Sequence, residues 1–339
     1  MNNKLSRRSF INSSAAVLAT ASLAPLAISC QTAPVVPSFP GFYDFGSKFG
    51  GVQIGCTTYS YRNMPIGIEN CVKYCRESGI NSIEFRRCED LEAFLGAPQM
   101  PQLEPASAPT PGERRRMTPE QQAIINQYNA DLKAWRIGVT PEKVAAAKKL
   151  FDDAGIEVHI VKFTPGRWSD EEIDYAFRAA KAMGAKGVSE EINDEWIKKM
   201  VPYAEKHGMY AIIHNHAQFA EQDFSIDPYL AISPSVMLNF DVGHYYGTTG
   251  LDPCDFIRKY HNRIFSLHFK DKTGPHTEPP NKEVVWGQGE TPLAEVLLLL
   301  KKEGWPIYVD IELEYAINPW SNQVKETRTC VQYARNILI

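Results

Sequence analysis

The stretch "MLNFDVGH" (residues 237–244) decides the fold, because a hydrophobic run ends there in side chains that bind metals. Three further runs end in the same way: "YAIIHNH" at 210–216, "IFSLHFKD" at 264–271 and "IYVDIELEY" at 307–315. Helical sequence follows each run, which is typical of alternating strands and helices. A parallel barrel brings the carboxyl ends of consecutive strands to one rim. The four runs therefore predict a metal enzyme built on a parallel barrel.

Eight strand candidates alternate with helical patterns along the chain. The predicted strands are roughly residues 52–56, 82–85, 156–163, 187–190, 210–214, 236–241, 264–268 and 307–312. The predicted helices are residues 68–78, 141–154, 170–183, 194–207 and 292–303. This number of alternations predicts an α/β protein, a single-domain (β/α)8 TIM barrel. An open doubly wound sheet is the rival fold, but "GCTTYSYR" (55–62) lacks the glycine-rich phosphate turn that such a sheet needs.

An insertion interrupts the alternation after the second strand. Residues 95–138 contain a proline-rich run, three arginines at 114–116 and the helix-like "TPEQQAIINQYNADLKAWR". In a barrel the insertion lies at the catalytic rim. It could form a lid, make an oligomer contact or be a solvent-exposed extension without a role in the site. The arginines fit a solvated surface better than a phosphate clamp. A shorter insertion, residues 273–286, follows the seventh strand.

The first thirty residues have the pattern of an export signal, and we set them aside from the fold. Residues 6–11, "SRRSFI", form a twin-arginine motif, and a small apolar stretch follows at 15–28. That stretch is too short and too alanine-rich to span a bilayer well. A disordered basic tail is the alternative. The signal predicts export by the twin-arginine route, to the periplasm or to a lipid-anchored place at the cell envelope.

The end of this signal resembles a relaxed bacterial lipobox, "LAISC" at 26–30, with Cys30 as the acylated residue. The leucine stands one place further from the cysteine than usual, so ordinary signal-peptidase cleavage is the alternative. Residues 31–50 are expected to be a tether, and residues 51–339 are expected to be the barrel domain. A lipid on Cys30 is the one membrane contact that the sequence predicts.

Charge and cysteine content exclude several classes of function. The chain has 36 basic and 40 acidic residues, and the leader holds three of the basic and none of the acidic ones. An acidic mature chain argues against nucleic acid as a partner. Seven cysteines, Cys30 included, are no disulfide framework for a domain of this size. Cys71 and Cys75 share a helical face, where a buried pair is favoured over a zinc site.

Strand geometry divides the polar residues at the strand ends into two roles. Residues two apart on a strand share a face, which pairs His214 with His216, His268 with Lys270, and Glu312 with Glu314. About 6.6 Å separates such neighbours along the strand, so only one member of each pair can ligate a single ion. The other member is placed for substrate binding or proton transfer.

Several motifs together resemble the xylose isomerase-like TIM-barrel family, the sugar phosphate isomerases and epimerases. The resemblance covers about residues 51–339 and is carried by "QIGCTTYSYR", "IEFRRCEDLEAFLGAP", "HNH", "DVGH", "LHFKD", "GQGETP" and "IELEY" in this order. The His-Asn-His and Glu-x-Glu-Tyr endings are similar to the exported, twin-arginine lipoprotein branch. Family members hold a divalent metal with Glu, Asp, His and Glu from four consecutive late strands. The resemblance therefore implies that Asp241, His268 and Glu312 ligate a metal.

The fourth ligand departs from the family pattern. His214 stands where many relatives carry the first glutamate, and the resemblance implies that it ligates the metal instead. In the epimerases that glutamate forms a proton-shuttling pair with the last one, so half of the pair is replaced here. Glu190 or Glu191 at the end of the neighbouring strand is the expected replacement, and Glu191 matches exported relatives better. The alternative is that both acids cap the following helix.

The remaining site residues take their expected roles from the same resemblance. His216 matches the family's substrate-side histidine, and Lys270 would stabilise an enediolate. His244 would bind substrate or orient a ligand, and Glu314 would bind substrate. The expected catalytic residues are Glu312, Glu191, His216 and Lys270. One divalent ion (Mn, Co, Zn or Mg) is the expected cofactor. Mixed imidazole and carboxylate ligands suit Mn, Co, Zn, Fe or Ni, whereas an all-oxygen site would favour Mg or Ca.

The implied chemistry is abstraction of a proton next to a sugar carbonyl, with a metal-bound enediolate. Export and the absence of a phosphate cradle among the motifs favour a non-phosphorylated keto-sugar or keto-glycoside. Similar exported proteins are associated with keto-glycoside breakdown, so an isomerase, an epimerase and a lyase or hydratase all stay open as the type of enzyme. A homo-oligomer also stays open. The rivals are a metal-dependent nuclease of abasic DNA, a metal-free glycosidase using Glu191 and Glu312, and a non-catalytic sugar-binding lipoprotein.

Overall fold

The computed structural model describes residues 46–65, 67–86, 88–103 and 117–339, all of which belong to one compact unit. The predicted signal (1–30) with Cys30, most of the predicted tether (31–50) and the arginines at 114–116 lie outside the described residues. Within the described ranges, no helix combines the length and the apolar character that crossing a membrane requires.

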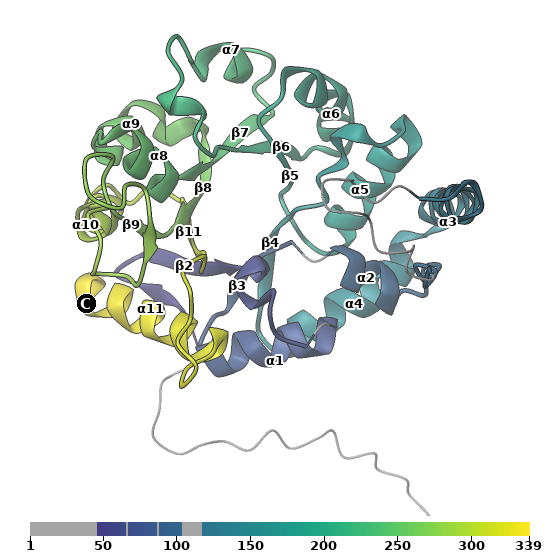
Figure 1. Ribbon diagram of the computed structural model, residues 1–339, viewed down its shortest axis with the longest axis horizontal. Helices are drawn as coiled ribbons and strands as arrows, with labels where there is room; N and C mark the ends of the chain where they lie inside the picture. The colour runs from purple at the N-terminus through teal and green to yellow at the C-terminus, as the bar shows by residue number, and fades with distance from the viewer. Residues whose placement is uncertain (1–45, 66, 87, 104–116) are drawn as a thin grey trace, which may run out of the picture. The chain divides into compact units, whose positions relative to one another are not determined.

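Eight parallel strands close into a barrel, which confirms the predicted (β/α)8 TIM-barrel fold (Figure 1). In hydrogen-bonded order they are β2 (Val52–Thr57), β11 (Tyr308–Ile311), β8 (Ile264–Phe269), β7 (Val236–Asp241), β6 (Tyr210–His214), β5 (Gly187–Glu191), β4 (Glu157–Val161) and β3 (Ser82–Phe85), and β3 pairs with β2 to close the ring. A short strand, β1 (Lys48–Phe49), pairs antiparallel with the start of β2 and comes from the predicted tether. Each barrel strand begins and ends within two residues of its predicted bounds.

Helices surround the barrel (Figure 1). They are α1 (Ile68–Ser78), α2 (Cys88–Phe94), α4 (Pro141–Asp153), α5 (Asp170–Ala182), α6 (Asp194–His207), α7 (Asp227–Leu230), α8 (Val242–Thr249), α9 (Pro253–Tyr260), α10 (Leu293–Glu303) and α11 (Gln323–Leu338). The five predicted helices are α1, α4, α5, α6 and α10. Their ends follow the expected chemistry, since Ser169 and Glu172 form a capping box at the start of α5 and Gly208 takes a left-handed conformation after α6.

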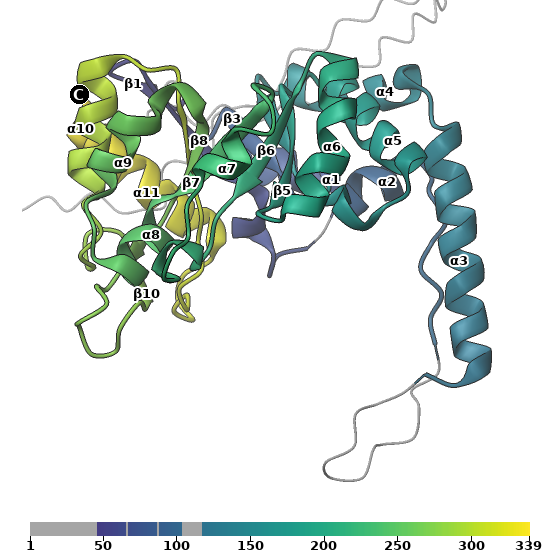
Figure 2. The same ribbon diagram turned by 90° about the horizontal axis from the view of Figure 1, so that it is seen from above.

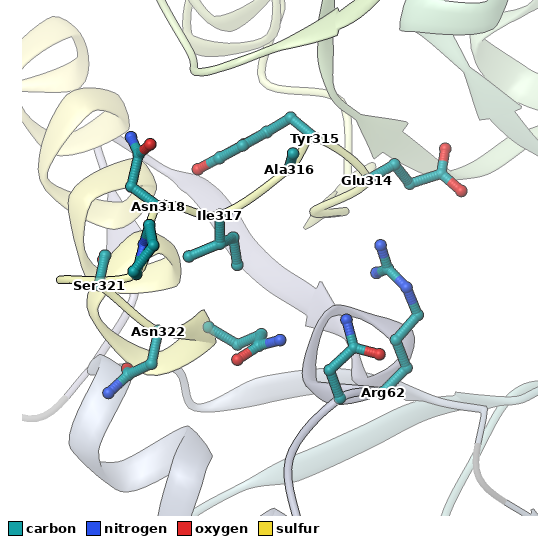
Figure 3. A pocket seen from close by; sticks show the side chains of 11 residues that line it. Arg62, Glu314, Tyr315, Ala316, Ile317, Asn318, Ser321 and Asn322 are labelled. Carbon is teal, nitrogen blue, oxygen red and sulfur yellow. The ribbon is translucent and has the colours of Figure 1, made fainter.

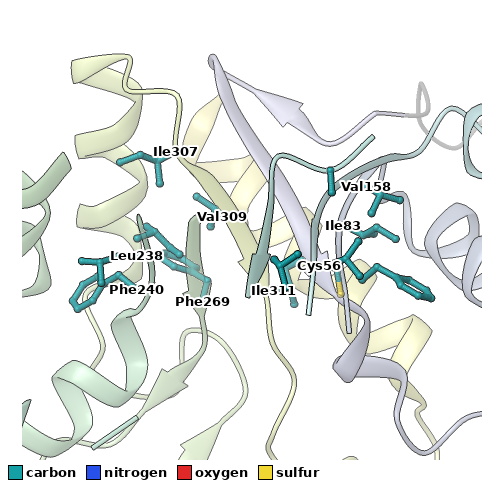
Figure 4. Packing of buried hydrophobic residues seen from close by; sticks show 14 of the residues in the cluster. Cys56, Ile83, Val158, Leu238, Phe240, Phe269, Ile307, Val309 and Ile311 are labelled. Atoms are coloured by element: carbon teal, nitrogen blue, oxygen red, sulfur yellow. The ribbon is translucent and has the colours of Figure 1, made fainter. Parts of the chain in front are cut away.

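The hydrophobic core lies where the outer faces of the strands meet the helices, and Figure 4 shows part of it. Phe240 of β7 stacks on Phe256 of α9 with ring centroids 4.2 Å apart. Burying a side chain of this size contributes about 1.5–3 kcal/mol. Cys71 and Cys75 of α1 are buried free thiols, as predicted. This layer holds the strands in register and leaves the barrel interior to polar side chains.

The insertion after β3 carries helix α3 (Pro119–Gly138), which stands away from the barrel (Figure 2). Thr118 and Gln121 form a capping box at its start, and none of its side chains is fully buried. Near its end, Arg136 bonds the carboxylates of Glu92 and Glu172 at 2.8–3.1 Å. The helix is therefore attached to α2 and α5 by its last turns. The second insertion contributes β10 (Glu283–Val284), which pairs antiparallel with β9 (Asp271–Lys272), the two residues just before the insertion.

Candidate metal centre

The carboxyl ends of four neighbouring strands bring the predicted ligands together. These side chains are His214 of β6, Asp241 of β7, His268 of β8 and Glu312 just after β11. All four are buried, and one ligand atom from each lies within 4.8 Å of the others. The convergence follows from the barrel order, in which these strands are consecutive. Their role as metal ligands stays a prediction.

Three of these side chains direct a polar atom at the same space. Within the described part of the chain, His268 Nδ1, Asp241 Oδ2 and Glu312 Oε2 are buried without a well-oriented hydrogen bond. The Glu312 Oε2 and His268 Nδ1 atoms lie 2.9 Å apart. The Lys270 ammonium lies 2.9 Å from Asp241 Oδ2 and 2.6 Å from Glu312 Oε2, so these oxygens have a charged neighbour. One imidazole and two carboxylates that converge on one space are nevertheless a donor set that fits a divalent cation.

The His214 imidazole is held in its neutral form. Burial lowers its pKa well below the ordinary value, and the charges of Lys162 and His268 act in the same direction. Its Nδ1 atom lies 3.3 Å from the Asn239 carbonyl oxygen, an arrangement that leaves Nε2 for a ligand. A neutral imidazole is the form that ligates metals. His214 therefore has the protonation state that a metal ligand needs.

Glu84 of β3 is a site residue that sequence reasoning missed. Its Oε2 atom accepts hydrogen bonds from His268 Nε2 and from Asn239 Nδ2, both at 2.7 Å. Burial disfavours a charged His268, but the carboxylates of Glu312 and Glu84 outweigh burial and raise its pKa well above the ordinary value. Glu84 thus fixes the orientation of His268. The signal that pointed to it was an acidic residue inside the otherwise apolar strand "SIEF".

The Lys270 ammonium lies against the same oxygens that a metal would use. Its Nζ atom is 2.9 Å from Asp241 Oδ2 and 2.6 Å from Glu312 Oε2, and it also contacts Glu314. Burial favours the neutral amine, but Asp241 and Glu312 outweigh burial and raise the pKa of Lys270 well above its ordinary value. Gly243 permits this approach, because a Cβ there would lie 2.3 Å from Lys270 Cγ.

The charges of the site do not balance. Five carboxylates meet in or beside it: Glu84, Glu191, Asp241, Glu312 and Glu314. Against them stand the ammonium groups of Lys162 and Lys270 and the imidazolium of His268, whose pKa is raised, which leaves two uncompensated negative charges. A site with this excess attracts cations and repels anions.

The opposite wall of the mouth carries the Glu191–His216 pair. Glu191 Oε2 lies 3.0 Å from His216 Nε2, and Glu191 Oε1 lies 2.8 Å from the Nζ atom of Lys162, a residue that the sequence did not predict. Burial opposes ionisation of Glu191, but the His216 hydrogen bond and the Lys162 charge lower its pKa to about 2. The His216 side chain is half exposed, so it reaches the open mouth.

The alternative in which Glu190 and Glu191 cap the next helix is wrong. Glu190 accepts hydrogen bonds from the backbone N–H of Gly166 at 2.7 Å and of Glu191 at 2.8 Å. Helix α6 is capped by Asn193, whose side chain accepts from the Trp196 N–H at 3.1 Å. Asn193 directly precedes the helix, which is the position from which a side chain reaches the free N–H groups.

His244 and Glu314 lie together at the rim. His244 Nε2 is 3.7 Å from Glu314 Oε2 and 3.9 Å from Asp241 Oδ2. Burial lowers the pKa of His244 to about 4, although Asp241 opposes this shift. The backbone N–H of His244 donates to Asp241 Oδ1 at 2.7 Å, so His244 also helps to fix Asp241. Both side chains therefore lie at the rim beside Asp241.

Comparisons with known proteins agree with the fold. Residues 126–333 match the family model described as "Xylose isomerase-like TIM barrel". No curated protein matches the chain.

Several solved structures share the fold at low sequence identity. A sugar phosphate isomerase/epimerase from Parabacteroides distasonis is 15% identical, with 85% of this chain and 96% of that chain covered and a TM-score of 0.55. A xylose isomerase domain protein from Alicyclobacillus acidocaldarius is 13% identical, with 84% and 98% covered and a TM-score of 0.56. The probable 3-DHS dehydratase AsbF from Bacillus anthracis is 13% identical, with 82% and 98% covered and a TM-score of 0.53.

Proposed function

Because the chain belongs to the xylose isomerase-like TIM-barrel family, we propose that it is a metal-dependent sugar isomerase or epimerase-type enzyme. It removes a proton next to the carbonyl of a non-phosphorylated keto-sugar or keto-glycoside. The observation that carries this proposal is the convergence of buried ligand atoms of Asp241, His268 and Glu312 with one of the neutral His214, all within 4.8 Å of one another.

One divalent ion would be held by His214, Asp241, His268 and Glu312. When bound, such an ion polarises a carbonyl group and stabilises negative charge that develops on its oxygen. Glu84 holds His268 in place for this role through its 2.7 Å hydrogen bond.

Glu312 and Lys270 form one wall of the reaction space. Burial opposes ionisation of Glu312, but His268 and Lys270 outweigh burial and hold its pKa well below the ordinary value. Glu312 is therefore an ionised carboxylate at neutral pH and serves as the proton acceptor. The Lys270 ammonium lies 2.6 Å from it and stabilises a negative oxygen on the substrate.

The Glu191–His216 pair supplies a second proton-transfer group on the other side. Strand β5 is the fourth neighbour of β11 in the ring of eight, so Glu191 and Glu312 rise from opposite walls. Returning a proton from the opposite wall inverts a carbon centre, which is epimerisation. Returning it at the neighbouring carbon gives an isomer.

The same two walls support a second candidate, a 3-keto-glycoside lyase or hydratase. His216 at the open mouth is placed to give a proton to a departing group, while Glu312 takes the proton beside the carbonyl. A third candidate is a barrel that binds sugar without catalysis. A purified protein with bound metal argues against this candidate, and a protein without metal argues for it.

The charge balance supports a substrate without phosphate. Lys162 is paired with Glu191, and Lys270 is paired with Asp241 and Glu312. Neither cation is free for an anion, and the site has an excess of negative charge. An uncharged keto-sugar or keto-glycoside meets no such repulsion.

The test is incubation of the purified protein with a 3-keto-glycoside in deuterated water containing Mn²⁺. We expect solvent deuterium in the sugar carbon next to the carbonyl. Deuterium without release of the aglycone supports the isomerase or epimerase, and release of the aglycone supports the lyase. Neither event with Mn, Co, Zn or Mg, together with a purified protein that binds no metal, overturns the proposal.

We also propose that the protein works outside the cytoplasm, because of the twin-arginine motif at Arg7 and Arg8. Replacing both by lysine is expected to leave the protein in the cytoplasm in cell fractionation. Cys30→Ala then separates the two envelope locations. A lipid-anchored protein becomes soluble in the periplasmic fraction, and a protein cleaved by the ordinary signal peptidase stays there unchanged.

A further inference from the structure

We propose that a pocket beside the metal centre binds a second sugar ring, joined to the ring that reacts. The pocket has a volume of about 430 Å³. Its walls are the segment after β2, with Arg62 and Asn63, and the segment that connects β11 to α11 (Figure 3). Sites that bind small molecules have volumes of about 300–1,000 Å³, so the pocket has room for a ligand group. This inference rests on the proposed function, whose substrate class it narrows.

Glu314 joins the pocket to the metal centre. It lines the pocket, and its Oε2 atom contacts Lys270 Nζ and lies 3.7 Å from His244 Nε2. Lys270 in turn contacts Asp241 and Glu312 at the centre. A substrate bound at the centre and extended past Glu314 therefore enters the pocket.

The lining of the pocket matches hydroxyl groups. Within the described part of the chain, the side-chain amides of Asn63, Asn318 and Gln323 make no hydrogen bond, although all three line the pocket. Each amide offers both donors and an acceptor, and a sugar hydroxyl group is also both donor and acceptor. Three uncommitted amides around one pocket thus suit a ligand with several hydroxyl groups.

The charged groups of the pocket do not suit an anion. The Arg62 guanidinium donates to the Leu313 carbonyl oxygen, lies 4.5 Å from the centre of the Tyr59 ring and points toward Glu314 (Figure 3). A lone arginine that is already bonded, beside a carboxylate in the same wall, is a poor site for phosphate. The ligand group is therefore expected to be neutral.

An exposed aromatic residue lies on the same segment. The Trp320 side chain is 76% exposed and stands in sequence between Pro319 and Ser321, which both line the pocket. Tryptophan is rarely left so open, since its large ring gains from burial, and it is enriched where partners bind. Together with the amides, it indicates that the substrate is a keto-glycoside of disaccharide size, in which a sugar is the group attached to the reacting ring.

The first experiment measures binding without chemistry. Cellobiose, glucose and glucose 6-phosphate are titrated into the metal-loaded protein in a calorimeter. We expect cellobiose to bind at least about tenfold more tightly than the other two, the equivalent of about one or two lost hydrogen bonds. The variant with Asn63→Ala, Asn318→Ala and Gln323→Ala is expected to lose that advantage. Asn336→Ala, an exposed amide on α11, is the matched control and is expected to bind like the wild type.

The second experiment measures deuterium exchange on 3-keto-cellobiose, with the keto group on the non-reducing ring, and on 3-keto-glucose. The triple variant is expected to raise KM about tenfold for the disaccharide, with kcat unchanged and the monosaccharide unaffected. Equal effects on both substrates overturn the second-ring pocket, as does tighter binding of glucose 6-phosphate. If neither substrate exchanges in the wild type, the proposed reaction fails, and the cellobiose titration still decides the pocket by itself.

Discussion

The barrel interior has two polar levels built from similar residues, and they behave differently. In the lower level, which lies nearer the amino ends of the strands, His159 Nδ1 lies 2.8 Å from Ser82 Oγ and His159 Nε2 lies 2.9 Å from Asp310 Oδ2. In the upper level, two residues further along β3 and β11, Glu84 and Glu312 flank His268. The upper level is the candidate metal centre. Both levels thus place a histidine beside a β11 carboxylate.

The two levels differ in whether their histidine is satisfied. Both nitrogens of His159 have partners, and the Tyr308 ring covers it at 4.1 Å between centroids. His268 has a partner on Nε2, but its Nδ1 atom faces Glu312 without a well-oriented hydrogen bond. A histidine beside a carboxylate is therefore a structural element at one level and a candidate ligand at the other. Residue type alone does not separate the two roles.

The largest expected effect is on the activity, when the upper level is changed. Glu312→Gln is expected to lower the rate of deuterium exchange by about 10²–10⁴-fold, because it removes the proton acceptor and a charged ligand. The fold should remain, since the side chain keeps its size. Exchange rate and metal content per chain are the measurements, with Glu303→Gln on the surface of α10 as the control. A Glu312→Gln protein with full activity would contradict the assignment.

A change in the lower level should reduce the stability of the protein instead of its activity. His159→Ala is expected to reduce the free energy of unfolding by about 3–5 kcal/mol, because Asp310 is left buried without its partner. Thermal unfolding followed by circular dichroism measures this loss. The folded protein should still bind metal and exchange deuterium. Loss of metal binding with unchanged stability would reverse the roles of the two levels.

Metal removal should affect only the upper level. Adding Mn²⁺ at about 100 times its dissociation constant is expected to raise the free energy of unfolding of the metal-free wild type by about 2.7 kcal/mol. His159→Ala should keep this gain, and Glu312→Gln should lose most of it. Unfolding midpoints with and without a chelator give the comparison. The distinction between the levels fails if Mn²⁺ stabilises all three proteins equally.

The smallest effect is expected at Glu84, which orients a ligand without being one. Glu84→Gln should weaken metal binding by about 10–100-fold, because the charged acceptor that holds His268 is replaced by a neutral amide. Competition between the protein and a metal indicator dye measures the affinity. Excess Mn²⁺ should restore activity, which separates this variant from Glu312→Gln. Activity that stays lost at saturating Mn²⁺ would show a direct role for Glu84.

The sequence predicted the fold because the strand runs and helix ends are local signals. The apolar run before Asp241 and the glycine after α6 need no knowledge of distant residues. The convergence of the four candidate ligands also followed, since a closed parallel barrel brings consecutive strand ends to one rim. Both predictions combine local pattern with one topological rule.

Contacts between segments that lie far apart in the chain could not be predicted from the sequence. Glu84 points at His268, 184 residues away, and the register between β3 and β4 shifts at Ile83 and Glu84. No local pattern shows such a shift, which decides where a side chain points. In the same way, Ser60, two residues before Arg62, bonds the Ile311 carbonyl oxygen across 251 residues. Lys162 was missed for this reason too, because its partner Glu191 lies on another strand.

Gly243 has a consequence for how this protein tolerates change. A methyl group there would meet the Lys270 side chain and, at 2.6 Å, the Lys270 carbonyl oxygen. Even alanine would push the ammonium away from Asp241 and Glu312, although position 243 has no side chain of its own. In a mutational scan this position should therefore be as intolerant as the acids themselves. The missing side chain at position 243 thus keeps the Lys270 ammonium in place and, with it, the charge balance of the centre.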